Sequence, residues 1–359
     1  MGYRYIGSKS KILDIVLNKI QKLAPVGSHI TDLMTGTATV AIELRKLGYK
    51  VTANDLMTYS YHHAVTGLKF QRSPSFEGAF EFIENNITKK EFRDDSVSAY
   101  SKFITALNNS QPIKGYFWNE FSLDGSPKNT EKPRNYYSSE NAAKIDGIRA
   151  NITKLKEKNS LTNVELSLVL HDLIMGTNDI ANIAGTYGHH MAKLSGRACD
   201  DLRLYTSDLL LLNDTENHTV LQGYAEDVSS QISCDVCYID PPYMKRQYAA
   251  NYHILETLAR GDIPEAIGVS GLRPWRDQYS NFCTKTKIRD SFRKIFTNMK
   301  TNNFLISYSE DGLLHLEDFI ELLTPYGQVE IDTFSHKRFK SNNSALKNEL
   351  TEYLIHLQR

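Results

Sequence analysis

The alternation of apolar and polar positions predicts an α/β sheet built from both ends of the chain. Near the N-terminus, residues 29–33 and 49–53 form short apolar runs suited to buried strands, and an amphipathic stretch at 37–47 separates them. Four further strands are predicted downstream, at residues 202–205, 219–222, 234–239 and 303–307. Residues 328–334 and 352–357 then alternate like an antiparallel pair.

The middle of the chain follows a different pattern. Residues 71–134 are polar, aromatic and rich in loop formers. Apolar residues then recur at helical spacing from about Glu140, and again from Asn163 to Ile180, in stripes that core packing explains. We therefore expect a sheet domain made of residues 1–68 and 204–359, interrupted by a mainly helical insert at 69–203.

Composition excludes several classes of protein. The 359 residues carry no net formal charge and include only four cysteines, too few for a disulfide framework. We expect no metal site: Cys234 and Cys237 lie three apart on a strand and so face opposite sides, and the pairs His62–His63 and His189–His190 lack ligand spacing. The chain shows no signal-peptide pattern and no stretch long enough to span a membrane, so a cytoplasmic location is expected.

The strand at 234–239 ends in an unusual turn, Asp240-Pro241-Pro242-Tyr243. Proline has no amide hydrogen, so the strand must stop at Asp240. Ligands of open parallel sheets bind at such strand ends. The turn offers oxygen acceptors without competing amide donors, and Tyr243 adds a flat face for stacking. The turn therefore suits a planar heterocycle that carries an exocyclic amine.

Such a turn can activate an amine as a nucleophile. The lone pair of the adenine amino group is delocalised into the ring, so the group is unreactive. Two acceptors that hold both hydrogens favour a pyramidal nitrogen, whose lone pair can attack an electrophile. The alternative is an ordinary strand that ends in a tight Pro-Pro turn, because a four-residue match carries a real risk of coincidence.

A second ligand site is predicted after the first strand. Asp32 ends that strand, and Gly36 allows the turn before the helix to approach a ligand closely. Asp55 ends the next strand, where a carboxylate can accept from ribose hydroxyls. The full glycine pattern of a pyrophosphate-binding turn is missing. The site therefore favours a nucleoside without phosphates, of which S-adenosylmethionine is the usual one.

These motifs together resemble the adenine-specific DNA methyltransferases, the class that includes the DNA adenine methylases and the type IIS modification enzymes. The resemblance rests on YIGSK at 5–9, DLMTGT at 32–37 and the DPPY tetrapeptide at 240–243. The segments ENAAKIDGIRANI, NDIANIAGTYGHHMAK, NYHILETLAR and SYSEDGLL extend it over nearly the whole chain. Two positions depart from the family pattern: Met34 replaces the usual Phe, and Ala38 a common Gly.

The resemblance implies a Rossmann-like fold for S-adenosylmethionine-dependent methyl transfer, with a mixed, mostly parallel sheet and an inserted target-recognition domain. It assigns catalysis to Asp240, Pro241, Pro242 and Tyr243. It also assigns cofactor contacts: Tyr5 and Lys9, Asp32 and Gly36 for the methionine part, Asp55 for the ribose, and Asp227 for the adenine amine. For Asp227 a helix N-cap is the alternative, and for Lys9 a solvated lysine.

A duplex DNA substrate adds a further requirement, because a base inside the duplex must be flipped out to reach such a pocket. Lys245, Arg246 and Tyr248 follow the catalytic turn and are expected to hold the strand. Lys337 and Arg338, in the HKRFK run, are further candidates for phosphate contacts, with a solvated hairpin face as the alternative. The insert is the candidate for target recognition, and its part at 115–137 mixes aromatic and basic residues as groove-reading loops do.

The resulting hypothesis is an enzyme that methylates N6 of adenine in a specific duplex DNA sequence, as the modification part of a restriction–modification system. A separately acting restriction endonuclease is the partner this would imply, and no membrane partner is expected. The alternatives are an N4-cytosine DNA methyltransferase and a catalytically silent DNA-binding relative. RNA or protein substrates leave the insert unexplained, and a nucleotide-dependent oxidoreductase lacks its glycine pattern.

Overall fold

The structure is a computed structural model that describes residues 12–212, 214, 217–337 and 349–359. The described chain forms two compact units. Unit 1 consists of residues 65–214 and 248–277, and unit 2 of residues 12–64, 217–247 and 278–359 with the gap given above. Within these residues, no helix is both long enough and apolar enough to cross a membrane.

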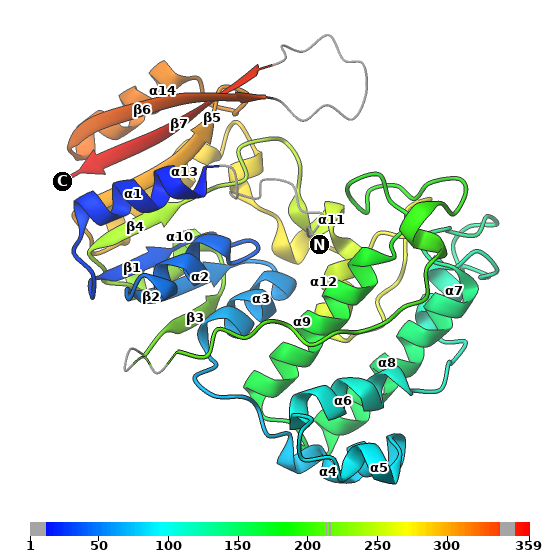
Figure 1. Ribbon diagram of the computed structural model, residues 1–359. Helices are drawn as coiled ribbons and strands as arrows, with labels where there is room; N and C mark the ends of the chain where they lie inside the picture. The colour runs from blue at the N-terminus through cyan, green and yellow to red at the C-terminus, as the bar shows by residue number, and fades with distance from the viewer. Residues whose placement is uncertain (1–11, 213, 215–216, 338–348) are drawn as a thin grey trace. The chain divides into compact units, whose positions relative to one another are not determined.

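Unit 2 is built on a seven-stranded sheet with the order β3-β2-β1-β4-β5-β7-β6 (Figure 1). Its strands are β1 (His29–Asp32), β2 (Lys50–Asp55), β3 (Thr219–Gln222), β4 (Val236–Ile239), β5 (Asn303–Ser309), β6 (Gln328–Lys337) and β7 (Glu349–Gln358). Every pair from β3 to β5 is parallel, and β7 runs antiparallel to both β5 and β6. The predicted Rossmann-like methyltransferase fold, with its antiparallel C-terminal pair, is confirmed.

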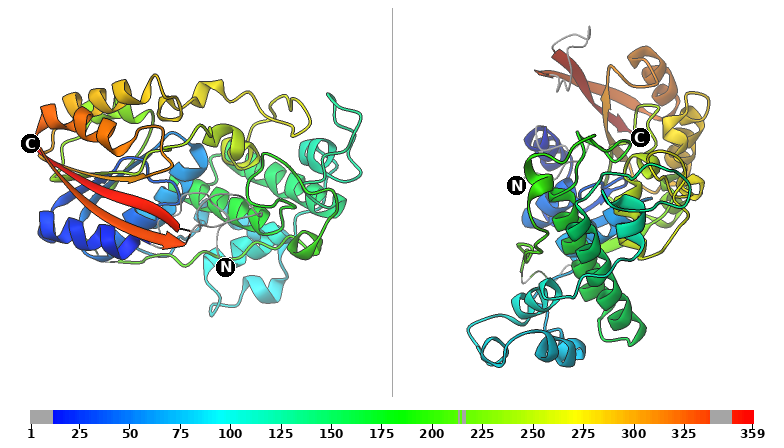
Figure 2. Two further views of the ribbon diagram at one scale, coloured as in Figure 1. Left: turned by 90° about the horizontal axis from the view of Figure 1, so that it is seen from above. Right: turned by 90° about the vertical axis from the view of Figure 1, so that its right-hand side faces the viewer.

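Helices cover both faces of this sheet, as Figure 2 shows for α1 on one side and α13 and α14 on the other. The helices of unit 2 are α1 (Leu13–Leu23), α2 (Thr39–Lys46), α10 (Ala225–Val228), α13 (Ile288–Asn298) and α14 (Leu316–Leu323), and α3 (Thr58–Leu68) crosses its boundary with unit 1. An apolar cluster of buried side chains lies between β4, β5 and the α13–α14 side. There Phe292 packs edge-on against Phe319, and Phe296 against Phe304. Because β4 is buried at all four positions, its sequence reads as continuously apolar rather than alternating.

Unit 1 is helical, as the insert was expected to be. Its helices are α4 (Phe80–Asn86), α5 (Lys89–Phe92), α6 (Ala99–Asn108), α7 (Tyr116–Phe121), α8 (Ser139–Glu157), α9 (Asn163–Asp179), α11 (Tyr248–Asn251) and α12 (His253–Arg260). Short 3-10 turns occur in both units, at Glu77–Ala79, Gly196–Cys199, Ser229–Gln231, Arg276–Gln278, Asn281–Cys283 and Thr324–Tyr326. The start of α9 is fixed by a capping box, in which Thr162 accepts from the Glu165 amide and the Glu165 carboxylate accepts from the Thr162 amide.

The prediction of a strand at 202–205 was wrong. This segment is extended, but its backbone partners are asparagine side chains on helices of unit 1. Asn108 both donates to the Leu204 carbonyl, at 2.9 Å, and accepts from the Leu204 amide, at 2.8 Å. Asn141 does the same for the Asp200 carbonyl and the Leu202 amide. Leu202 and Leu204 are buried, so the alternating pattern that suggested a strand reflects packing on helices.

The units also divide the chain differently from the expected domains of 1–68 with 204–359 and 69–203. Residues 248–277 follow the Asp240–Tyr243 tetrapeptide closely in sequence, yet they cluster with unit 1. The reason lies in α12, where His253 is buried and its Nε2 lies 3.0 Å from the Tyr187 carbonyl. In addition, Arg149 of α8 donates to the Asp262 carbonyl at 2.6 Å. These contacts join residues far apart in the sequence, so no local sequence pattern predicts them.

Candidate active site

The predicted site residues of unit 2 converge because three parallel strands end side by side. β1 pairs with both β2 and β4, so Asp32, Asp55 and Asp240 come to the same edge of the sheet. The charges of Asp240 and Asp55 each raise the pKa of Asp32, which confirms that the three carboxylates lie close together. The structure thus unites residues that the sequence had assigned to two separate motifs.

Asp32 is buried, and one of its two carboxyl oxygens has no hydrogen-bond donor among the described residues. Its side chain is 1% exposed, and its Oδ2 accepts from the Thr35 hydroxyl at 3.0 Å. Although the nearby Ala41 amide lowers the pKa, no described group forms a hydrogen bond with Oδ1. Burial, more than the neighbouring carboxylates, raises the pKa of Asp32 to about 7. A buried acceptor of this kind calls for a donor from a ligand.

The loop after β1 is held in place by Asn54 and Asp55 at the end of β2. The Asp55 carboxylate accepts from the Gly36 amide at 2.8 Å and from the Met57 amide at 2.9 Å. The Asn54 side-chain amide donates to the Leu33 carbonyl, and the Asn54 backbone carbonyl accepts from the Thr35 amide. Sequence reasoning gave Asn54 no role, because the two loops that it joins are separated by nearly twenty residues.

The structure places Gly36, for which the sequence predicted a tight turn, in a left-handed backbone conformation. Gly36 has a φ of 54°, a conformation that glycine adopts at little cost. Ala38 has a φ of 62° and precedes α2, so at this departure from the family pattern an alanine takes a left-handed conformation. Ala38 is fully buried, and its β-carbon is therefore accommodated by the fold.

The strand β4 ends at Ile239, directly before Asp240, as the two prolines required. Pro241 is buried and Asp240 half-buried, and no described residue donates a hydrogen bond to the Pro241 carbonyl. The acceptor oxygen predicted at this position therefore has no donor within the described part of the chain.

The Tyr243 ring is supported from behind by the segment after β5. It lies edge-on to Tyr308, with 5.8 Å between ring centroids, and the Tyr243 carbonyl accepts from the Leu313 amide at 2.9 Å. Gly312 is required there, since a β-carbon would come within 2.3 Å of the Tyr308 ring. This support comes from SYSEDGLL, a segment that the sequence analysis noted for its resemblance without giving it a role.

Lys245 and Arg246 are exposed, and neither forms an ion pair with any residue in the part of the chain that the structure describes. The backbone beneath them is fixed, because the Gln247 side chain both donates to and accepts from the Ser280 backbone, at 2.9 and 2.8 Å. Tyr248 instead opens α11 in unit 1, where its ring stacks on Tyr252.

Asp227 is exposed in the first turn of α10, which follows β3. It is the third residue of that helix, and Tyr224 is the N-cap, so the N-cap alternative was wrong. Tyr5, Lys9 and Arg338 lie outside the described residues. Lys337 is the last residue of β6, and nothing further is shown for it.

The aromatic residues at 115–137 have a different place from the one expected. Phe117, Phe121, Tyr136 and Tyr137 are buried and pack on one another. Arg134 is also buried, in an ion pair with Glu120 at 2.5 Å. These four rings thus form a core, and a groove-reading role for the segment at 115–137 stays a prediction that falls to its exposed residues, such as Lys128 and Lys132.

The histidines and cysteines show no arrangement that would favour a metal. His62 and His63 are buried on α3, and the thiols of Cys234 and Cys237 are free. Among the described residues, no group of three His, Cys, Asp or Glu side chains could hold an ion.

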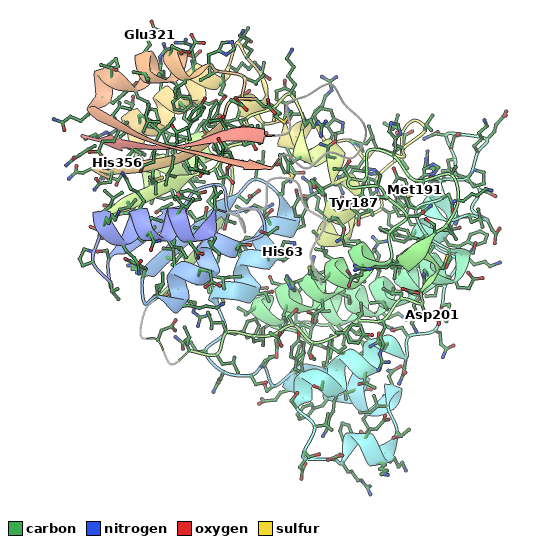
Figure 3. The ribbon with its side chains drawn as sticks, turned by 45° about the horizontal axis from the view of Figure 1, so that its top comes forward. His63, Tyr187, Met191, Asp201, Glu321 and His356 are labelled. Atoms are coloured by element: carbon green, nitrogen blue, oxygen red, sulfur yellow. The ribbon has the colours of Figure 1, made fainter. Side chains whose placement is uncertain are left out.

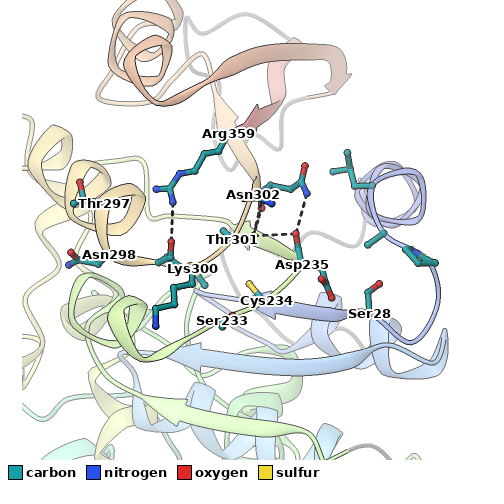
Figure 4. Close-up of a pocket in the computed structure, with 15 residues that line it drawn as sticks. Ser28, Ser233, Cys234, Asp235, Thr297, Asn298, Lys300, Thr301, Asn302 and Arg359 are labelled. Atoms are coloured by element: carbon teal, nitrogen blue, oxygen red, sulfur yellow. Dashed lines mark hydrogen bonds between the residues drawn. The ribbon is translucent and has the colours of Figure 1, made fainter.

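A cavity of about 690 Å³ lies at the other edge of the sheet, at the amino ends of β4 and β5 (Figure 4). Three of its polar residues are hydrogen-bonded within the protein. Asp235 accepts from the His29 amide at 2.7 Å, Thr301 donates to the Asp235 carbonyl, and Arg359 donates to the Met299 carbonyl. Its described lining residues include no buried acceptor without a donor, in contrast to Oδ1 of Asp32.

Comparison with known proteins adds independent evidence. Residues 5–322 match the model of the family described as D12 class N6 adenine-specific DNA methyltransferase. Type II methyltransferase M.CviAII of Paramecium bursaria Chlorella virus 1 is 33% identical, over 98% of this chain and 97% of the relative. Type II methyltransferase M.FokI of Planomicrobium okeanokoites is 31% identical over 99% of this chain, which spans only 52% of that relative.

Among solved structures, a precorrin-6y C5,15-methyltransferase from Geobacter metallireducens aligns with 98% of this chain and 90% of its own. The TM-score is 0.31 and the identity 10%, and a similarity this low supports no conclusion.

Proposed function

Because this chain belongs to the D12 class of N6 adenine-specific DNA methyltransferases, we propose that it methylates the N6 amino group of adenine in a specific duplex DNA sequence. The proposed methyl donor is S-adenosylmethionine. One observation carries the proposal: the buried Asp32, whose Oδ1 has no donor among the described residues, lies beside the acceptor turn that starts at Asp240.

The acceptor turn suits the amino group of a flipped adenine. The Asp240 carboxylate and the Pro241 carbonyl accept the two N–H hydrogens, and Tyr243 offers its ring for stacking. Both acceptors favour the pyramidal nitrogen, whose lone pair forms the new N–C bond. Transfer leaves one excess proton on that nitrogen, and the Asp240 carboxylate is the nearest base to receive it.

The loop after β1 fits the proposed donor. S-adenosylmethionine supplies a methyl group on a positively charged sulfur, which leaves as a neutral thioether. The unmet Oδ1 of Asp32 suits its ammonium group, and the local negative charge suits the cation as a whole. The exposed Asp227 is available for the adenine amine. Asp55 would serve the ribose in addition to holding Gly36 and Met57.

The exposed cations Lys245 and Arg246 would hold phosphates beside the flipped nucleotide. Such contacts offset part of the few kcal/mol that extrusion costs. Sequence recognition is assigned to unit 1, including residues 69–203, because groove contacts need surface beyond the catalytic sheet. Lys337 and Arg338 are proposed as further phosphate contacts.

A role as a modification methyltransferase is proposed from the names of the relatives that the chain resembles. The relatives are named as type II methyltransferases or modification methylases. A restriction enzyme of the same specificity, acting as a separate protein, would be the corresponding partner.

One assay tests the reaction. The protein is incubated with S-adenosylmethionine labelled in the methyl group and with duplex DNA, which is then digested to nucleosides. Label is expected in N6-methyladenine. Label in N4-methylcytosine, or in RNA alone, would overturn the proposal, and DNA binding without any transfer would indicate a silent relative.

Replacing Asp240 tests the assignment of catalysis. Asp240→Ala is expected to lower the transfer rate by about a thousandfold, since it removes an acceptor that acts on the transition state. Asp235→Ala, at the opposite end of the same strand, serves as the matched control and should retain transfer. Near-normal turnover of Asp240→Ala would refute the role of Asp240, provided both variants show the wild-type circular dichroism spectrum.

A further inference from the structure

Asn54, near the end of β2, joins the loops that follow the two neighbouring strands of unit 2. Its side-chain amide donates to the Leu33 carbonyl, after β1, at 3.0 Å and to the Gly223 carbonyl, after β3, at 3.2 Å. Asn54 is 1% exposed, and its Oδ1 has no donor among the described residues. Both hydrogens of the amide are thus used, and the side chain crosses from one loop to the other at the carboxyl edge of the sheet.

The strand ladders alone do not hold these two loops at a fixed separation. β1 and β3 each pair with β2 and not with each other. The ladders end at the pairs Asp32–Ala53 and Asp55–Gln222, one residue before the loops begin. A side chain from the central strand that donates to both loops therefore sets their distance beyond the point where the ladders stop.

The loop after β1 orients Asp32, the residue proposed to bind the amino-acid part of the cofactor. The Thr35 amide donates to the Asn54 backbone carbonyl at 2.9 Å, and the Thr35 hydroxyl donates to Oδ2 of Asp32 at 3.0 Å. Together with the bond from the Asn54 side chain to the Leu33 carbonyl, these contacts tie the loop to the end of β2 at two points. A change at Asn54 would therefore reach Asp32 through the loop.

The loop after β3 leads into α10, which carries Asp227, the residue proposed for the adenine amine. Gly223 packs closely against this helix, since a β-carbon there would come within 2.9 Å of Val228 Cγ1. The helix is held on its other side by the Glu226 carboxylate, which accepts from the Ser291 hydroxyl of α13 at 2.6 Å. α10 is therefore fixed both to the loop before it and to α13.

We propose that Asn54 is a positioning residue, which sets the separation between the two halves of the S-adenosylmethionine site, the amino-acid half at Asp32 and the adenine half at Asp227. This inference rests on the proposed function, which supplies the cofactor and both contacts. A ligand that spans two subsites gains affinity only when their spacing matches its length. Fixing that spacing in advance lowers the entropic cost of binding. Asn54 acts through the two backbone carbonyls that it holds, and not by contact with the cofactor.

The test measures how Asn54→Ala binds two compounds, by isothermal titration. S-adenosylhomocysteine, the product of the proposed reaction, has both halves of the cofactor, whereas methylthioadenosine lacks the amino-acid half. The variant should bind S-adenosylhomocysteine at least about tenfold more weakly than wild type and methylthioadenosine less than about threefold more weakly, because only a ligand that spans both loops depends on their separation. A general loosening of the fold would weaken the binding of both compounds alike.

Asn303→Ala is the matched control, because it removes an asparagine that bonds to the backbone at the other edge of the same sheet. Asn303 donates to the Asp235 carbonyl at 3.2 Å, and its Oδ1 lies 3.0 Å from Nε2 of His356, which Figure 3 labels. This variant loses hydrogen bonds of the same kind, and it should bind both compounds as the wild-type protein does.

Equal weakening of both compounds by Asn54→Ala, or unchanged binding of both, would overturn the role of Asn54 and leave the proposed function intact. If Asn54→Ala does not fold, Asn54→Ser replaces it in the test, because a water beside the serine can donate to the two carbonyls. The loss should again be larger for S-adenosylhomocysteine, and an equal loss would count against Asn54 in the same way. If the wild-type protein binds neither compound, the proposed cofactor is wrong, and the role of Asn54 with it.

Discussion

Asp32 in unit 2 and Asp172 in unit 1 are two buried carboxyls that look alike until their partners are compared. Their exposed fractions are 1% and 2%, and burial raises the pKa of each to about 7. Asp172 accepts from the Tyr100 hydroxyl at 2.5 Å and from the Ser207 hydroxyl at 2.6 Å, so both its oxygens have donors. Asp32 has a single side-chain donor, and its other oxygen has none among the described residues.

The hydrogen-bond partners distinguish Asp172, which has a structural role, from Asp32, which is proposed to bind a ligand. Asp172 fastens the extended segment at 200–207 onto the helices of unit 1, and no carboxylate is among the causes that raise its pKa. Asp32 faces Asp240 and Asp55, which make its ionised form still less favourable. A perturbed pKa alone does not mark a site. The missing donor and the neighbouring acids are what point to a cationic ligand.

The largest expected effect is on the pH dependence of stability. Each folded carboxyl keeps its proton up to a pH of about 7, whereas the unfolded chain releases it near the ordinary value of 3.8. The folded state therefore binds more protons across this window, and the free energy of unfolding falls as pH rises from about 4 to 7. The upper bound is about 4 kcal/mol for each group, at about 1.4 kcal/mol for each pH unit.

Chemical unfolding between pH 4 and pH 8 measures this slope. Asp32→Asn and Asp172→Asn should each remove the contribution of one carboxyl to this pH dependence. Adding S-adenosylmethionine should reduce only the contribution of Asp32 to the slope of the unfolding free energy against pH, because a bound cation stabilises the ionised form of Asp32. Curves for both variants that run parallel to that of wild type would show that neither carboxyl titrates as inferred.

Cofactor affinity should give the next largest effect. Asp32→Asn keeps the shape of the side chain and removes its charge, so the binding of S-adenosylmethionine should weaken by about a hundredfold, the worth of one charge-assisted hydrogen bond. Isothermal titration gives the affinity directly. Asp172→Asn is the matched control and should change it by less than about threefold. If both variants weakened the binding of S-adenosylmethionine equally, the proposed difference in role between Asp32 and Asp172 would be wrong.

The smallest effect comes from removing one donor to each acid. Ser207→Ala and Thr35→Val should each lower the free energy of unfolding by about 1–2 kcal/mol, because a buried carboxylate loses a partner. Transfer should slow only in Thr35→Val, and the pH at which its rate is half-maximal should rise. If Ser207→Ala slowed transfer to the same extent, measured per folded molecule, Asp172 would not be merely structural.

Where a strand stops, the sequence was informative. Two prolines cannot donate to a sheet, so the end of β4 at Ile239 followed from the residues themselves, and the turn at Gly36 likewise. The pattern at 202–205 misled because alternation shows which side chains are buried but not what the backbone bonds to. Here that partner is a pair of asparagines, Asn108 and Asn141, distant in sequence.

The seven strands of the sheet and the acceptor turn at Asp240–Tyr243 could be predicted from the sequence, although one further predicted strand, at 202–205, was wrong. The turn could be predicted because backbone geometry and donor count are properties of a few adjacent residues. Three features became visible only in the folded chain: Asp32 keeps an oxygen without a donor among the described residues, residues 248–277 belong with the helical unit, and the rings at 115–137 are buried. The physical reason is that burial and hydrogen-bond partners are supplied by segments far away along the chain. No local sequence pattern predicts which of these distant segments will contact one another.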